Sequence, residues 1–583
     1  MAVSHPTIRL AQVRVDAHPD VRPEVDGIGP FLSPLPTVTL LREESTAHPV
    51  ALAIAAAWSC YGAKPALVEN VRRLIEDPPP ATLDAAKART RAERRDRALA
   101  LYRDLFAAGH HTTMQHASFT FILDNVSRLA IWSFFHAHPN YNSEQVSQRY
   151  REVTGETMVT PRLAEPAAAV YREAVARALV GYERLTEILT PDMARHYASV
   201  FPARAKARGE EAAGKMAAAV QKRAQEVARY VLPLATPAHL YHTVNALTLL
   251  RYHALANQPD APAEVRVIVA QMVREVLAMD PNYLGAPGYL LDLRTLAVEE
   301  SPEGQALVAW QASLAQSPDR AEAFCARFDA QLGDLDSRLV AHNPGAEALM
   351  AEAVRSVAGM GPDELPDAEA LASVLDGAHN AYLGHPLFLG MHSKLMQTMN
   401  HVPFTFQKRI SGAEDAQNQR HRGTLGSRPI LMAHLRREPD VIVPHAIARN
   451  PDARAEYDAT VAALWAAINT LRDMGTGPEP LLYLLPNAHR VRFYESGTLL
   501  NYYWKWVKRL CYDAQREIFD TARQEVAQVR EVLPAIGHHV AGPPCVMRSR
   551  SGAKPFCPEG ERYCGIPVWR DYAFETLGER RVM

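Results

Sequence analysis

The chain lacks several features that define whole classes of protein. It has six cysteines in 583 residues, too few for a disulfide framework, which favours a reducing, cytoplasmic location. The apolar run PVALAIAAAWSC at residues 49–60 is too short to span a bilayer and predicts a helix instead. The first residues, MAVSHPTIRLAQVRVD, have no apolar segment after a basic one, so we expect no signal peptide. These absences argue against a membrane protein.

A charge excess of either sign is also absent. The formal net charge is −2 at pH 7, which argues against nucleic-acid binding through bulk electrostatics. A local basic pocket is still compatible with this balance. The best candidate is the stretch FTFQKRISGAEDAQNQRHRGTLGSRP at residues 404–429, where Arg420, His421, Arg422 and Arg428 fall within nine positions. We expect such a stretch to bind an anion.

The chain does have length and an ordinary globular composition. Its 583 residues are too many for one hydrophobic core, so two or more domains are expected. Hydrophobic residues make up 48% and charged residues 22%, which is typical of a soluble globular protein.

The sequence also repeats itself. TMQHASFTF at residues 113–121 matches TMNHVPFTF at residues 398–406. A serine follows each stretch, Ser127 or Ser411, and nine residues later comes the triplet HAH or RHR. Self-similarity of this kind predicts two copies of one structural unit.

A second pair of motifs supports the duplication. YVLP at residues 230–233 matches YLLP at residues 483–486. From each proline, thirty-one residues lead to a glutamate, Glu264 or Glu517. Equal spacing over this distance, without a gap, is hard to obtain by chance.

The local patterns predict a mixed α/β (α+β) fold. FTFIL and PFTFQ have the aromatic and β-branched alternation of strands, whereas residues 167–185, 210–231 and 454–474 have apolar residues at helical spacing. We expect two homologous tandem domains, each a mixed sheet packed with helices. The predicted boundaries are an extended arm at 1–35, a first domain at 36–300, a linker at 301–335, a second domain at 336–535 and a tail at 536–583.

Arginine, serine and glutamine near strand ends and helix starts suit a nucleoside monophosphate. Arginine forks bind phosphate through two hydrogen bonds, a serine hydroxyl adds a donor, and a glutamine amide can pair with a uracil imide. The alternative is that these arginines form surface salt bridges, which is the commoner role of a single arginine.

The combined motifs favour the nucleotide. GHHTTMQHASFTF, NVSR, SQRY, RHR and ARYVLP together resemble the flavin-dependent thymidylate synthases, over most of the chain and in both halves. The resemblance implies FAD-dependent C5 methylation of a pyrimidine nucleotide: dUMP becomes dTMP with methylenetetrahydrofolate and NADPH. The family forms homotetramers with shared active sites, so a chain with two such domains is expected to form a homodimer.

The resemblance divides the nucleotide site between the halves. The second half has Gln417 and Arg509 where the first has Ser133 and Ala256. The first half has Ser147, Arg149 and Arg229, whereas the second has Leu482 at the position of Arg229. Together they imply one composite site, with Arg509 as the catalytic residue that stabilises charge on the pyrimidine. Glu144 or Gln145 is expected near the substrate sugar.

The cofactor residues that the resemblance implies are less complete. Those that match are Arg420, His421, Arg422, His110, Thr112, Gln115 and Asn245. The family motif NxR is broken in both halves, since Leu247 and Leu500 replace its arginine. Two other functions therefore stay open: an enzyme for another pyrimidine nucleotide such as UMP, and a non-catalytic nucleotide-binding paralogue.

Two further groups of residues contain side chains that can bind a metal ion. His136 and His138 replace the arginines of RHR, and we interpret them as relics of a lost cofactor contact rather than metal ligands. In the tail, Cys545, Cys557, Cys564 and His539 have the chemistry of a structural zinc site, with free thiols as the alternative. We interpret Cys511, close to Arg509, as a buried structural thiol.

Overall fold

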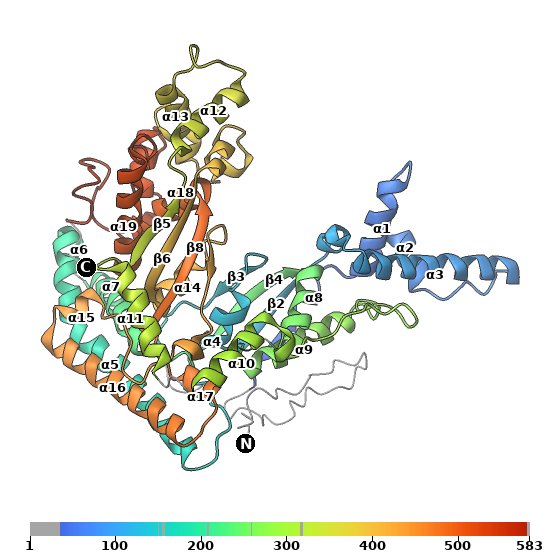
Figure 1. Ribbon diagram of the computed structural model, residues 1–583, viewed down its shortest axis with the longest axis horizontal. Helices are drawn as coiled ribbons and strands as arrows, with labels where there is room; N and C mark the ends of the chain where they lie inside the picture. The colour runs from blue at the N-terminus through green and yellow to red at the C-terminus, as the bar shows by residue number, and fades with distance from the viewer. Residues whose placement is uncertain are drawn as a thin grey trace.

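The computed structural model describes residues 35–149, 151–153, 158–206, 209–257, 259, 261–314, 319–540 and 542–579. These residues contain two four-stranded sheets, one in each repeat, and Figure 1 shows them in separate lobes. The expected arm at residues 1–35 lies outside the described residues, except for its last residue. Within the described ranges, every helix is too short or too polar to cross a membrane.

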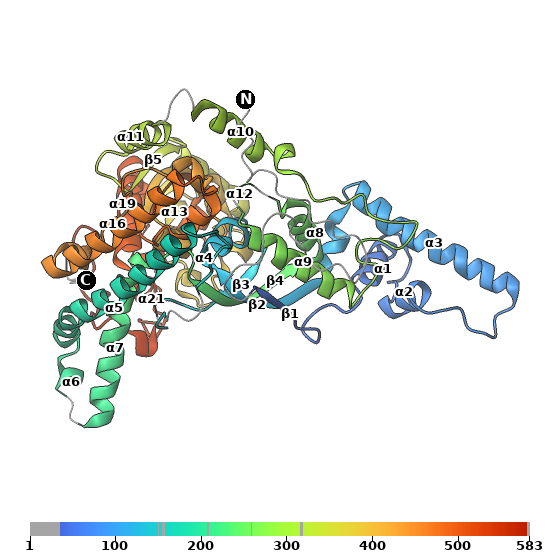
Figure 2. The same cartoon turned by 90° about the horizontal axis from the view of Figure 1, so that it is seen from below.

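The first sheet has the strand order β1-β2-β4-β3. Its strands are β1 (Thr37–Leu40), β2 (Ser118–Ser127), β4 (Pro237–Asn245) and β3 (Asn142–Gln145). On β2, Phe119, Phe121 and Leu123 alternate with more exposed residues and are fully buried, as expected when one face of a strand packs on a core. The core beneath them comes from α1 (Pro49–Tyr61), α8 (Ala246–Leu255) and α9 (Ala263–Leu277). In Figure 2, α3 (Ala85–Ala107) projects away from this lobe.

The second sheet repeats this plan with the order β5-β6-β8-β7. Its strands are β5 (Ser337–His342), β6 (Pro403–Ser411), β8 (Arg490–Thr498) and β7 (Leu425–Ser427). Phe404 and Phe406 on β6 are buried against α18 (Leu499–Arg509) and α19 (Arg516–Val532). The helices α12 (Ala346–Ala358) and α13 (Asp367–Leu375) extend the same core.

The predicted mixed α/β fold with two homologous units is confirmed. The expected strands fall in β2 and β6, and the expected helices fall in α5 (Ala167–Val200), α7 (Glu210–Ala228) and α16 (Pro451–Asp473). The direction of the strands differs from expectation, because every paired strand in both sheets is antiparallel rather than mixed.

The segments outside the sheets are also helical in part. α10 (Pro302–Leu314) and α11 (Arg320–Leu332) occupy most of the predicted linker at residues 301–335. In the tail, α21 (Pro544–Arg550) buries Val546 and Met547 in the second core, and Val568, Phe574 and Leu577 follow them. The tail therefore has apolar residues of its own with which to pack.

The two halves meet about a local twofold axis at the repeated prolines. Pro233 and Pro486 form an antiparallel bridge. The backbone N–H of Leu234 donates to Leu485 at 2.8 Å, and the N–H of Asn487 donates to Leu232 at the same distance. α5 and α16 lie side by side across this axis (Figures 1 and 2), and residues of both halves form one continuous core.

One glycine allows the two long helices to approach closely. A Cβ added at Gly181 of α5 would lie 2.3 Å from the Oγ1 of Thr460 on α16. A larger residue at this position would force the helices apart, because real side-chain contacts are never so short. The helix pair therefore fixes the distance between the halves.

Matched hydrogen bonds also cross between the halves. The hydroxyl of Tyr230, in the first half, donates to Glu517 in the second, which also accepts from Ser411 Oγ at 2.6 Å. At the equivalent place Ser127 donates to Glu264, and Tyr483 of the second half lies against the same carboxyl. The repeated tyrosines and glutamates of the sequence thus contact each other across the axis.

The buried Glu264 gives stability a measurable pH dependence. Burial raises its pKa to about 8, whereas its ordinary value is 4.5. Between these values the folded chain holds a proton that the unfolded chain releases, so this group lowers stability as pH rises. We expect Glu264→Gln, which cannot ionise, to gain stability over the wild type by about 1.4 kcal/mol per pH unit between pH 5 and 8.

Denaturant titrations at pH 5, 6.5 and 8 measure this difference. Glu531→Gln is the matched control, because Glu531 is exposed and its replacement should change stability by less than about 0.5 kcal/mol. A difference between Glu264→Gln and the wild type that does not change with pH would contradict the shifted pKa.

Candidate active site

A cavity of about 430 Å³, here called the central cavity, lies between the two halves. Its lining includes nine residues that the sequence singled out: His136, Glu144, Gln145, Ser147, Arg149, Arg229, Gln417, Arg420 and Arg509. The first six belong to the first half and the last three to the second. These residues of the two halves therefore line one cavity.

Two arginines of the first half, Arg149 and Arg229, lie at the central cavity. Arg149 pairs with a carboxylate of α7, and Arg229 follows the end of that helix. Arg149, which follows β3, pairs through Nε with Glu226 at 2.8 Å and donates from NH2 to the carbonyl of Asp513 at 3.0 Å. Arg229 is buried just after α7, where its NH2 donates to the Oε1 of Gln515. Although burial opposes it, the charges of Arg149, Arg223 and Arg229 lower the pKa of Glu226.

On the second half, a short helix and the end of α18 supply the opposite wall. Gln417 lies in α14 (Gly412–Asn418) and donates from Nε2 to Gln515 Oε1 at 2.6 Å. Arg509, the last residue of α18, donates from Nε to His421 Nε2 at 2.9 Å and from NH2 to the Gln417 carbonyl at 2.7 Å. These contacts fix the direction of both side chains.

The central cavity is electropositive. Arg128, Arg149, Arg229, Arg420 and Arg509 all line it, whereas Glu144 is its only lining carboxylate among the described residues. Burial, together with the neighbouring Arg149 and Arg420, lowers the pKa of Arg509 to about 10, and burial with Arg229 and Arg420 lowers that of Arg128 to about 9. Both stay charged at neutral pH. Arginines gathered in this way are matched by a bound anion such as a phosphate.

Gln515 is the residue that the sequence analysis missed. Its Oε1 accepts from Gln417 and from Arg229, and its Nε2 donates to Tyr230. It therefore joins the two halves behind the central cavity. A signal was present, since Gln515 lies two residues before Glu517, but spacing alone does not show which side chain points inward.

A smaller space of about 300 Å³, the side cavity, adjoins the central one and shares His136, Glu144 and Arg420 with it. The ring of His136 stacks on Tyr141, with 4.6 Å between the ring centroids. Arg422 lies over the same tyrosine and donates to Asn142 Oδ1 at 2.9 Å. Aromatic faces beside two arginines suit a flat ring that carries an anionic group.

The other expected cofactor residues lie elsewhere. His110, Thr112 and Gln115 are exposed near the start of β2, and Asn245 accepts from the N–H of Thr248 as the N-cap of α8. None of these four lines the central or the side cavity. His421 also lines neither cavity, because it is turned toward Arg509.

The predicted zinc site is not supported. Among the described residues, which include Cys545, Cys557, Cys564 and His539, no group of three or more His, Cys, Asp or Glu side chains is arranged to hold a metal. Cys545 is buried in the apolar packing of α21, and Cys564 donates to the carbonyl of Ile566. Burial raises the pKa of all three thiols, so they favour the protonated form.

His138, the second histidine of the HAH triplet, has an ordinary hydrogen-bond partner. His138 Nε2 lies 2.8 Å from the hydroxyl of Tyr252, which is 2.9 Å from His242 Nε2. Burial lowers the pKa of His138 to about 4, so this histidine is neutral at neutral pH.

Comparison with known proteins gives consistent results for both halves. The sequence model of the family described as "Thymidylate synthase complementing protein" matches residues 42–282 and 338–535. A flavin-dependent thymidylate synthase of Nitratidesulfovibrio vulgaris is 28% identical over 254 residues, which cover 39% of this chain and 93% of the relative. One from Mycobacterium sp. strain JLS is 26% identical over 179 residues, covering 31% of this chain and 66% of the relative.

Among solved structures, a UMP/dUMP methylase, PolB of Streptomyces cacaoi bound with 5-Br dUMP, is 20% identical. The match covers 42% of this chain and 92% of that one, with a TM-score of 0.27. The family match, by contrast, covers more than half of the chain and falls on both repeats. The chain therefore belongs to the thymidylate synthase complementing protein family.

Proposed function

We propose that the chain methylates C5 of a pyrimidine nucleotide, converting dUMP to dTMP with methylenetetrahydrofolate and NADPH. One observation carries this proposal. Arg149 and Arg229 of the first half face Gln417 and Arg509 of the second across one cavity of about 430 Å³. The family membership of both halves, and the relatives that are flavin-dependent thymidylate synthases, support the same reaction.

Each lining residue has a role that its position allows. Arg149 and Arg229 bind the phosphate, and the hydroxyl of Ser147 adds a donor. Gln417 pairs with the uracil edge through its amide, and Gln145 lies near the sugar. Arg509 is the catalytic residue: its charge stabilises the pyrimidine carbonyl as negative charge develops and C5 becomes nucleophilic. The protein therefore needs no cysteine nucleophile.

The side cavity fits a flavin. Tyr241 offers an exposed ring face, Arg420 and Arg422 offer charge for a phosphate, and the buried His136 Nε2 has no hydrogen-bond partner among the described residues. We assign Arg420 and Arg422 to FAD on this basis. When bound, the flavin supplies the hydride for the reaction.

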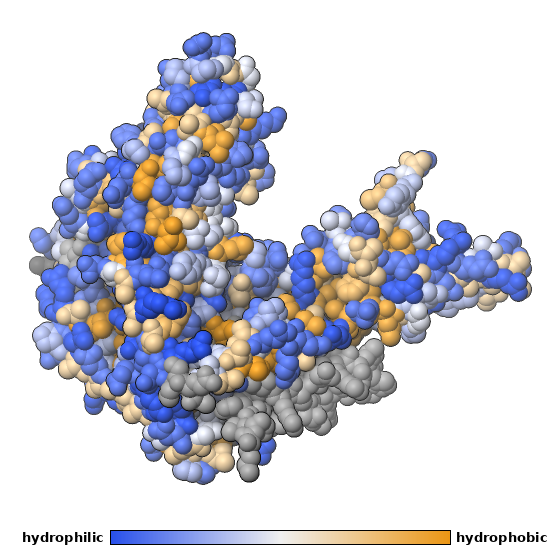
Figure 3. Space-filling view, viewed as in Figure 1, coloured by the Kyte–Doolittle hydropathy of each residue, from blue (hydrophilic) through white to orange (hydrophobic). Residues whose placement is uncertain are grey.

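We further propose a homodimer. His110, Thr112, Gln115 and Asn245 lie outside both cavities, so a second copy has to bring them to a flavin. The two sheets expose equivalent tyrosines, Tyr241 at 54% and Tyr494 at 42%, and Figure 3 shows a hollow between the lobes. Light scattering should give twice the chain mass of 64.5 kDa, and a monomer would contradict this assembly.

A turnover assay tests the function. The purified full chain is mixed with FAD, NADPH and methylenetetrahydrofolate, and with dUMP, UMP or dCMP in parallel, and the products are identified by mass spectrometry. We expect dTMP from dUMP, and none when the folate is omitted. Methylation of UMP but not of dUMP would show that UMP, and not dUMP, is the substrate. A chain that turns over none of the three and gains no flavin absorbance would be a non-catalytic nucleotide-binding protein.

A further inference from the structure

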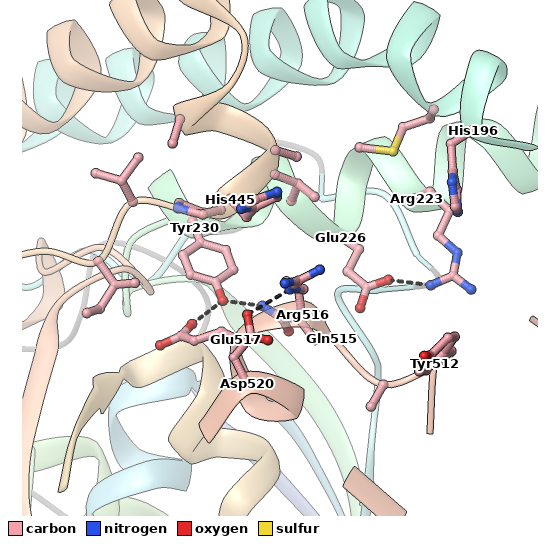
Figure 4. Close-up of a pocket in the computed structure, with 18 of the residues that line it drawn as sticks. His196, Arg223, Glu226, Tyr230, His445, Tyr512, Gln515, Arg516, Glu517 and Asp520 are labelled. Carbon is pink, nitrogen blue, oxygen red and sulfur yellow. Dashed lines mark hydrogen bonds and ion pairs between the residues drawn. The ribbon is translucent and has the colours of Figure 1, made fainter. Parts of the chain in front are cut away.

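A third cavity, of about 330 Å³ and here called the rear cavity, also lies between residues of the two halves (Figure 4). α5 and α7 of the first half form one side of it. Residues 442–448 and 512–520 of the second half form the other side, and Ile566 comes from the tail. Its volume is within the usual range of small-molecule sites. Among the residues that the structure describes, the rear cavity shares none of its lining with the central or the side cavity.

Four carboxylates and two arginines, beside His196 and His445, line the rear cavity. Glu226, Asp336, Glu517 and Asp520 face two arginines, Arg223 and Arg516. Both arginines are already paired: Arg223 with Asp513 and Glu226, and Arg516 with Asp520 Oδ2 at 2.7 Å.

The other oxygen of Asp520, Oδ1, is buried and has no hydrogen-bond partner among the described residues. A buried acceptor without a donor is costly, so a ligand that brings an N–H group would be favoured here. An anionic ligand would instead be repelled by the surrounding carboxylates. These observations indicate a neutral or cationic ligand with hydrogen-bond donors.

The remaining walls suit a flat ring. Ile442, Val443 and Pro444 form an apolar surface, and Figure 4 shows Tyr230 and His445 close together above Arg516 and Asp520. Aromatic and apolar side chains around a few polar groups are typical of sites for heteroaromatic compounds. A ring with an exocyclic amino group meets both requirements.

The repeat shows that the fold does not require this polar lining. Gln515, two residues before Glu517, corresponds to Pro262 before Glu264. Asp520, three residues after Glu517, corresponds to Val267. The equivalent place on the other side of the twofold axis therefore has apolar residues at both positions, although the backbone plan is the same.

Two lining residues link the rear cavity to the central one. Glu226 pairs with Arg149 at 2.8 Å, and Gln515 accepts from Arg229 and Gln417. A ligand that shifts either side chain would change the position of groups that line the central cavity. Coupling between two sites requires physical contacts of this kind.

We propose that the rear cavity is a second ligand site, for an amino-substituted bicyclic heteroaromatic ring such as an aminopurine or a pterin, and that its occupation changes the affinity of the central cavity for its nucleotide. The amino group donates to Asp520, and the ring packs between residues 442–444 and Tyr230. This site goes beyond the proposed methylation and does not depend on it.

Isothermal titration of the full chain with adenine and, separately, with pterin tests the site. Comparing the two Kd values shows whether the site prefers an aminopurine or a pterin. We expect at least one probe to bind with a Kd below about 1 mM. Purine, which lacks the amino group and keeps only its ring N–H as a donor, should bind about 10-fold more weakly because it loses the hydrogen bond from the amino group to Asp520. Failure of both probes to bind, or equal binding of purine, overturns the proposal.

Two variants locate the binding. Asp520→Asn removes the acceptor charge and should weaken the probe about 10-fold. Ala448→Trp fills the rear cavity from its exposed rim and should abolish binding, whereas Ala358→Trp, at the exposed end of α12, should have no effect. Unchanged binding in Ala448→Trp places the probe elsewhere and overturns the proposal.

The probe titrations are repeated on the dUMP-saturated chain, and dUMP is titrated into the chain with and without the probe. We expect the probe still to bind and the Kd for dUMP to change about 5-fold or more. Competition between the probe and dUMP, or an unchanged Kd for dUMP, overturns the coupled second site. Because the probe is also titrated without nucleotide, failure of the proposed methylation is distinguishable from failure of this site.

Discussion

Arg149→Ala should lower the affinity for dUMP by about 100-fold or more, and Arg509→Ala should do the same from the other half of the chain. Arg149 is a charged donor whose side chain is only 16% exposed, so its loss removes charge-assisted hydrogen bonds to the phosphate. It also leaves the buried Glu226 with one cation fewer, and this carboxylate would then repel the phosphate.

The effect of Arg509 has a different origin. Its side chain holds His421 and the Gln417 carbonyl, so its removal both deletes a positive charge and loosens the wall that binds the base. Isothermal titration of dUMP measures both variants. The matched controls are Arg151→Ala and Arg523→Ala, since each is an exposed arginine near one of the two positions in sequence. Full affinity in either Arg149→Ala or Arg509→Ala would rule out a site shared by the halves.

The sequence allowed much of the fold to be predicted, because local patterns and the repeat agree. Phe119 and Phe121 match Phe404 and Phe406, and both pairs are buried on the equivalent strand of their sheet. The motifs YVLP and YLLP predicted equivalence, but not that their prolines pair with each other on an axis. Contacts across a twofold axis join residues far apart in sequence, and periodicity does not reveal them.

The candidate site was predictable to the extent that residue type determines a role. Arg149, Arg229, Gln417 and Arg509 line one cavity as expected. Arg428 belongs to the basic stretch at residues 404–429, but it donates from Nε to Asp415 Oδ2 at 2.7 Å and does not line the central cavity. A sequence shows that arginines are clustered but not which of them has a buried carboxylate as its partner.

The zinc site predicted for the tail was not supported for a similar reason. Three cysteines and a histidine within a short segment have the right chemistry for zinc, but the number of thiols does not determine their geometry. In the structure Cys545 packs with Val546 and Met547 in an apolar core. Burial among apolar side chains stabilises the tail by the hydrophobic effect, and no metal is needed to explain its packing.

A buried charge network supports the RHR turn of the second half. Lys408 Nζ lies 2.7 Å from Glu525 Oε1 and 3.3 Å from Glu495 Oε2, and Lys505 pairs with Glu495. All four side chains are at most 3% exposed. Although burial opposes it, the charges of Glu495 and Glu525 raise the pKa of Lys408.

The network also reaches residues on either side of that turn. Glu495 Oε1 accepts from Asn418 Nδ2 at 2.6 Å and from Thr424 Oγ1 at 3.4 Å. Arg420, His421 and Arg422 lie between these two anchors. In the first half, where HAH replaces RHR, Leu123 and His242 occupy the positions equivalent to Lys408 and Glu495. The charged network therefore accompanies the turn that keeps its arginines.

Lys408→Met should lower the free energy of unfolding by about 3–5 kcal/mol, because it leaves Glu495 and Glu525 buried with only Lys505 to balance them. A denaturant titration followed by circular dichroism measures the loss. Lys394→Met is the matched control, since Lys394 is exposed and its replacement should change stability by less than about 0.5 kcal/mol. If Lys408→Met were as stable as this control, the two carboxyls would have to take up protons without cost, and the network would not anchor the RHR turn through charge.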